Sequence, residues 1–164
     1  MRSWTTGFAF LVATLASAGC DGSDDDESSR QAQVYLATIR DVLDEQPPPS
    51  DPDVLPDVYV VGGGESNVPA DVQAEVVGEL HEDADIHFED ERSDALLVEE
   101  DTAPVRNEGI LVLIGEVPPE ADPVDVDVEV YRSVADWSRR VFTVAGAGSQ
   151  WTVTSTSVVL ANNA

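Results

Sequence analysis

Residues 109–130 read GILVLIGEVPPEADPVDVDVEV, and this stretch decides the fold class. Its first part, 109–117, is strongly apolar and is typical of a central β-strand, and the prolines that follow predict a turn. In 124–130 valine alternates with an acidic residue, so we expect the valines to face a core and the acids to face water. Two further β-rich runs follow at 139–144 and 151–160. The four runs together predict an antiparallel meander.

The preceding part of the chain predicts two helices and two more strands. A capping-box pattern and apolar residues at helical spacing predict a first helix over 28–45. The runs 55–61 and 85–88 are strand-like, and the apolar stripe between them predicts a helix over 69–80. We therefore expect one α+β domain over 30–164, built from an N-terminal helix, a strand-helix-strand unit and a four-stranded antiparallel meander.

The charge balance excludes several classes of function. The chain has 164 residues, with 33 Asp and Glu against 8 Lys and Arg, and its formal net charge is −25. Binding to nucleic acid or to anionic lipid through a basic face needs clustered cations, which the scattered arginines do not supply. So acidic a surface keeps a protein soluble and attracts cations or basic partners.

Residues 1–19 have the order of a secretory signal peptide: a start with one cation, an apolar run too short for a permanent membrane span, and small residues. The segment Leu15-Ala16-Ser17-Ala18-Gly19-Cys20 resembles the lipobox of bacterial lipoproteins. The resemblance implies that Cys20 is lipidated and becomes the new N-terminus. The protein would then be anchored to the cell membrane on its extracytoplasmic face.

The acidic segment that follows, within residues 20–29, is expected to be a tether that holds the domain off the membrane. Cleavage before Gly19 by an ordinary signal peptidase is the alternative, and it would give a secreted protein. Cys20 is the chain's single cysteine, so no disulfide stabilises the domain.

The segment 81–90 combines both histidines of the chain with carboxylates. On a strand, Asp83, Asp85 and His87 would share one side, with His81 beside them, and such side chains are ligands for Zn²⁺. We interpret this segment as an acid-rich strand edge in contact with water, because surface acids are abundant in this chain. The alternative is an exported metal-binding domain or a metal-dependent hydrolase that uses these side chains.

Other catalytic motifs are missing from the sequence. There is no Gly-x-Ser-x-Gly motif, the three glycines 62–64 are followed by Glu65 rather than by a phosphate-binding lysine, and the lipid would occupy the thiol of Cys20. The leading prediction is therefore a non-enzymatic lipoprotein of the cell envelope, without a cofactor, whose small domain binds a partner or has a structural role.

Overall fold

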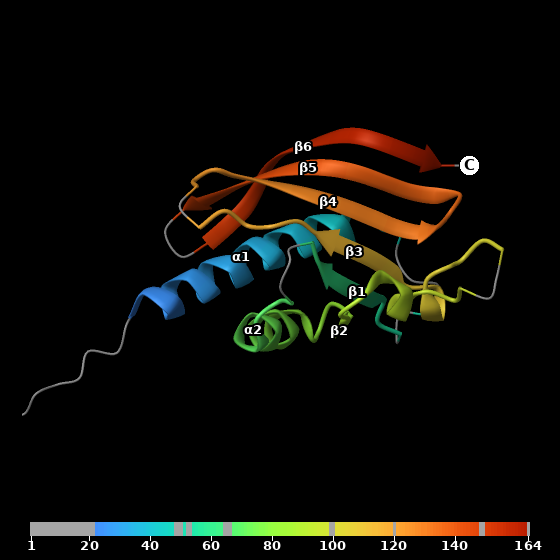
Figure 1. The fold of residues 1–164 in the computed structure, drawn as a ribbon, viewed down its shortest axis with the longest axis horizontal. Coiled ribbons are helices and arrows are strands. Elements are labelled where there is room, and N and C mark those ends of the chain that lie inside the picture. Colours follow the sequence, from blue (N-terminus) through green and yellow to red (C-terminus); the bar gives the residue numbers. More distant parts are fainter. Residues whose placement is uncertain are drawn as a thin grey trace, which may run out of the picture.

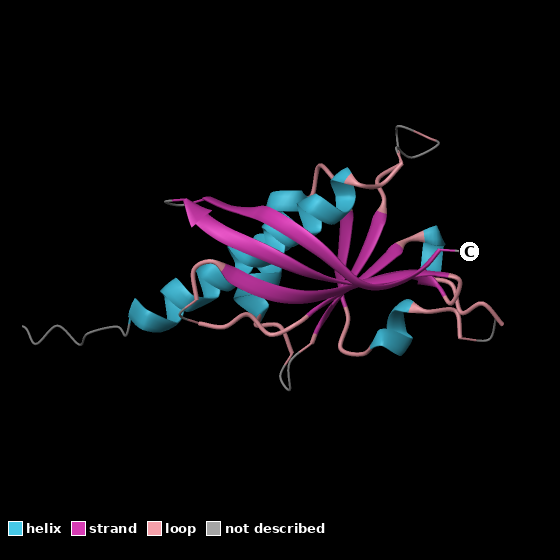
Figure 2. Ribbon diagram, turned by 90° about the horizontal axis from the view of Figure 1, so that it is seen from above, coloured by secondary structure: helices cyan, strands magenta, loops and turns pink. Residues whose placement is uncertain are grey.

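The structure, a computed structural model, places two helices on one face of a six-stranded sheet (Figures 1 and 2). It describes residues 22–47, 51, 54–63, 67–98, 101–119, 121–147 and 150–163. The predicted signal peptide and the predicted lipidation site Cys20 lie outside the described residues.

The described residues form two α-helices and six strands. They are α1 (Gly22–Asp44), β1 (Asp57–Gly62), α2 (Ala70–Leu80), β2 (Asp85–Phe88), β3 (Ile110–Ile114), β4 (Val124–Ser133), β5 (Asp136–Ala147) and β6 (Gln150–Asn163). Two short 3₁₀ helices, η1 (Arg92–Ala95) and η2 (Arg106–Glu108), lie between β2 and β3.

The sheet has the strand order β2-β1-β3-β4-β5-β6, so it is mixed. β1 is parallel to β2 and to β3, whereas β3 to β6 are antiparallel to their neighbours. The α+β class and the strand-helix-strand unit β1-α2-β2 are confirmed. The separate four-stranded meander is wrong, because its strands join β1 and β2 in one sheet. β3 is apolar and nearly buried on both faces, so it can hold β1 on one side and β4 on the other.

The main core lies between the helices and the sheet. In β4 the valines are buried while Asp125 and Asp127 are exposed, as the alternating sequence predicts. The helices contribute Val34, Ile39, Val42, Val72, Val76 and Leu80, and the sheet contributes Val58, Val60, Ile86, Val112, Ile114, Val124, Val126, Val128, Val130, Phe142 and Val144. These residues pack against one another as one contiguous cluster, which is the main core of the domain.

The opposite face of the sheet has a smaller core, covered by the segment that holds η1 and η2. Tyr59, Leu111 and Tyr131 are buried there together with Ala95 of η1. The guanidinium of Arg92 lies 4.3 Å from the ring centre of Tyr131, and it also forms an ion pair with the Glu129 carboxylate. The covering segment is therefore fastened to the sheet by both apolar and charged contacts.

Two element boundaries differ from the sequence prediction. α1 begins at Gly22 rather than at residue 28, so the predicted tether is helical from there on. β5 begins at Asp136, because the Ser133 hydroxyl accepts hydrogen bonds from the backbone N–H groups of Ala135 and Asp136 and closes a tight turn. Neither described helix combines the length and the apolar character that crossing a bilayer requires.

Candidate functional site

The first residues of two parallel strands bring a histidine and two carboxylates together. β1 and β2 pair with Asp57 opposite Asp85 and with Tyr59 opposite His87. Because side chains alternate along a strand, these four lie on the sheet face that points away from the helices, while Val58 and its neighbours face the main core. The parallel register is thus what builds the site.

The three potential ligands are close enough to share one metal ion. His87 Nε2 lies 2.9 Å from Asp57 Oδ1 and 3.7 Å from Asp85 Oδ2, and one ligand atom from each residue falls within 4.8 Å of the others. The exposed side-chain fractions are 20% for Asp57, 36% for His87 and 66% for Asp85, so an ion could reach the site from solvent.

Tyr59 and Asn107 support this cluster from one side. The Tyr59 ring stacks on the His87 imidazole, with 4.9 Å between ring centres and 22° between planes. Asn107, which has a left-handed backbone (φ 54°), donates its side-chain N–H groups to Tyr59 Oη at 3.2 Å and to Asp57 Oδ1 at 3.4 Å. Burial, together with the negative charge of Asp57, raises the pKa of Tyr59 against the opposing effect of Arg106. The Tyr59 hydroxyl therefore stays protonated at neutral pH.

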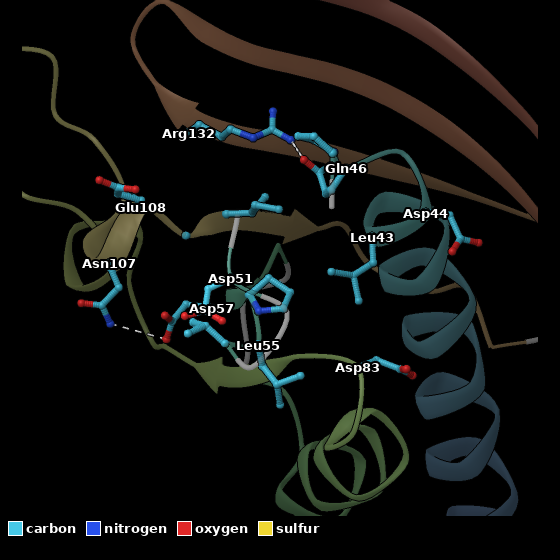
Figure 3. Close-up of a pocket in the computed structure, with 15 residues that line it drawn as sticks. Leu43, Asp44, Gln46, Asp51, Leu55, Asp57, Asp83, Asn107, Glu108 and Arg132 are labelled. Atoms are coloured by element: carbon cyan, nitrogen blue, oxygen red, sulfur yellow. Dashed lines mark hydrogen bonds between the residues drawn. The ribbon is translucent and has the colours of Figure 1, made fainter. Parts of the chain in front are cut away.

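Asp57 also lines an open cavity of about 600 Å³ between the end of α1, the segment before β1 and the segment before β3 (Figure 3). Its acidic lining residues are Asp44, Asp51, Asp57, Asp83 and Glu108. The lining cation is Arg132, whose guanidinium forms an ion pair with Asp136 at 3.2 Å and a hydrogen bond with Gln46. The cavity thus has an excess of negative charge and favours a cation.

The structure separates the four ligands that the sequence predicted. Asp85 and His87 are in the cluster. His81 follows α2, where its Nδ1 donates to the Gly78 carbonyl at 2.7 Å and its Nε2 lies 3.9 Å from Glu82. Asp83 lies in the turn before β2 and lines the cavity instead. Asp57, which sequence reasoning missed, completes the cluster.

One imidazole nitrogen and two carboxylate oxygens suit a divalent transition metal better than Ca²⁺. Ca²⁺ takes six to eight oxygen ligands, whereas imidazole with carboxylates is a common ligand set for Zn²⁺. Three protein ligands leave the fourth position of a tetrahedral ion open to water or to another molecule. The same geometry also permits a simple hydrogen bond from a His87 N–H to Asp57, without any metal.

Comparison of this chain with protein-family models, with curated proteins and with solved structures finds no match. The basis for assigning a function is therefore the chemistry of its own residues.

Proposed function

We propose that this chain is an exported, lipid-anchored protein whose domain binds a divalent transition-metal ion such as Zn²⁺ through Asp57, Asp85 and His87. The observation that carries the metal proposal is the convergence of these three ligand atoms within 4.8 Å. Two elements that pair in register bring them together, so the cluster does not depend on flexible loops.

The surroundings add two features that favour a metal site. Tyr59 holds the His87 ring by stacking, and Asn107 holds the Asp57 carboxylate by a hydrogen bond. Such outer contacts orient metal ligands before the ion arrives. The acidic cavity beside Asp57 raises the local concentration of cations, and the exposed side of Asp85 leaves a route to the site.

Calorimetric titration of the chelator-treated chain with Zn²⁺ tests the metal proposal, at a salt concentration that screens diffuse cation binding. We expect binding of one ion, and at least about a 100-fold loss of affinity in His87→Ala, because loss of an outer contact alone costs about 10–100-fold. The matched control is His81→Ala, which removes the other histidine and should leave the affinity unchanged.

A second pair of substitutions tests whether Asp57, which the structure places in the cluster, or Asp83, which the sequence pattern predicts, is a ligand. Asp57→Asn should weaken Zn²⁺ binding strongly, whereas Asp83→Asn, with the same change of charge at the same cavity, should change it little. Equal effects of the two substitutions would mean that the ion is held by diffuse negative charge. Unchanged binding in His87→Ala would contradict the site altogether.

The anchor is proposed on the sequence alone, from the signal-like residues 1–19 and the lipobox-like segment that ends at Cys20. Two or three acyl chains supply the apolar area that a stable anchor needs. Metabolic labelling with palmitate should mark the wild-type chain and not Cys20→Ser. Equal labelling of both chains would contradict the anchor at Cys20, and an unmodified N-terminus at Gly19 would favour the secreted alternative.

A further inference from the structure

Strand β6 forms a long and exposed edge of the sheet. It has 14 residues, and among the described strands it pairs only with β5. The side chains from Thr154 to Asn162 are all exposed, and Val158, Val159 and Leu160 expose 62%, 54% and 56% of their surface. The backbone groups along the outer side of such a strand are a template for a further strand.

This edge is also the neutral part of a strongly acidic protein. Residues 141–164 contain no Asp, Glu, Lys or Arg, although the chain as a whole has a net charge of −25. Natural edge strands are commonly protected from pairing by charged side chains, by proline or by shortness. β6 has no charge and no proline, it is long, and its threonines, serines and valines favour strand pairing.

The charge distribution favours a second copy of this chain as the partner of β6. A basic partner would be attracted to the acidic faces of the domain rather than to β6. Two copies repel each other wherever acidic surfaces meet, and this repulsion is weaker along β6, whose own side chains are uncharged; Asp41 of α1, which adjoins β6, hydrogen-bonds Thr156. The identical strands can pair antiparallel about a two-fold axis, so that both copies use the same surface.

The opposite edge of the sheet explains why such an assembly would stop at two copies. β2 has four residues, begins with the exposed Asp85 and is followed by Glu89 and Asp90. A short and acidic edge is a poor template for an uncharged strand. Contact of β6 with β2 would propagate into a filament and is thus disfavoured. Contact of β6 with β6 uses the same edge of both copies and gives a closed dimer.

We propose that two copies of this chain pair antiparallel through β6 and form a two-fold dimer with a continuous sheet. The dimer does not involve the metal cluster, which lies at the other edge of the sheet. It is therefore independent of the proposed metal function.

A scan with single cysteines in the full chain tests this pairing. Each residue from 152 to 161 is replaced by cysteine in turn, and the wild-type chain, with Cys20 alone, gives the background. Antiparallel partners have Cα atoms about 4.5–5.5 Å apart, within the reach of a disulfide, but only next to the two-fold axis does a residue face its own copy. We expect disulfide-linked dimers to peak at one or two neighbouring positions and to decline on both sides.

Two variants with the same change of charge complete the test. In the best cross-linking variant outside position 158, Val158→Glu places like charges on the paired edge and should reduce the dimer to the wild-type background, whereas Val77→Glu on the exposed side of α2 should not. Circular dichroism verifies that both variants are folded. A flat cross-linking profile, a yield no higher than that of the wild type, or dimers that survive Val158→Glu would each overturn the proposal.

Discussion

Two adjacent valines of α2 allow the burial of the helix to be tested by one chemical change at two positions. Val76 is fully buried in the main core, and Val77 exposes 39% of its surface. Both substitutions, Val76→Ala and Val77→Ala, remove two methylene equivalents, which contribute about 1.6 kcal/mol when fully buried. Both also gain about 0.5 kcal/mol of helix propensity, so this gain cancels between them.

The expected free energies of unfolding follow from the burial of each residue. Val76→Ala loses the whole transfer term and leaves a cavity, so with the propensity gain it should destabilise the protein by about 2 kcal/mol. Val77→Ala loses about 60% of the transfer term and opens no cavity, which gives a net loss of about 0.5 kcal/mol.

Urea denaturation followed by circular dichroism measures both variants. The midpoint should shift about four times as far for Val76→Ala as for Val77→Ala, with the slope of the transition unchanged. If the two free energies of unfolding lie within about 0.5 kcal/mol of each other, α2 does not pack on the sheet through the face described above.

Three further perturbations have expected outcomes. Gly109→Ala should destabilise the fold and weaken Zn²⁺ binding in calorimetry, because the added Cβ would lie 2.7 Å from the Asp57 carbonyl oxygen. Gly78→Ala is the control: its Cβ would meet no atom within 4 Å, so it should stabilise α2 by about 0.5–1 kcal/mol. Burial, reinforced by the carboxylates of Glu45 and Asp44, raises the pKa of Asp41, so the folded state holds this proton more tightly than the unfolded state does. The resulting stability is present at low pH and is lost as the pH rises through the raised pKa. Asp41→Asn should therefore raise the urea midpoint near pH 7 and leave it unchanged near pH 3; a stabilisation of equal size at both would contradict this origin. The midpoint temperature of thermal unfolding should rise when NaCl is raised from about 20 mM to about 0.5 M, because screening reduces the repulsion within a chain of net charge −25. A midpoint that does not change with salt would show that the acids are spaced too widely to repel.

Local sequence pattern predicted the elements of the fold better than their assembly. The alternation in 124–130 fixed which side chains of β4 face the core, and 85–88 was identified with the bounds that β2 has. The pairing of β1 with β3 was missed because it joins Val58 to Ile110 across some fifty residues, and periodicity carries no information about such distant partners.

The metal cluster illustrates the same limit. The sequence pattern groups Asp83 with Asp85 and His87 because Asp83 stands two residues earlier, but β2 begins only at Asp85, so the strand alternation does not extend to Asp83. Asp57 was predicted to lie on the neighbouring strand without being recognised as a ligand. The signal was present, since parallel strands of a strand-helix-strand unit place their first residues side by side and Asp57 and Asp85 both begin a strand.

The first turns of α1 project beyond the sheet as a straight rod (Figure 1). From Gly22 to Ser28, where the side chain hydrogen-bonds Asp71 of α2, the rod rises roughly 9 Å, at about 1.5 Å per residue. A flexible linker of the same length would let the domain tumble freely about its point of attachment. A chain attached at Cys20 would instead carry its domain on a stiff stalk, so the stand-off from the bilayer and the direction in which the acidic cavity opens would be set together by the tilt of one helix.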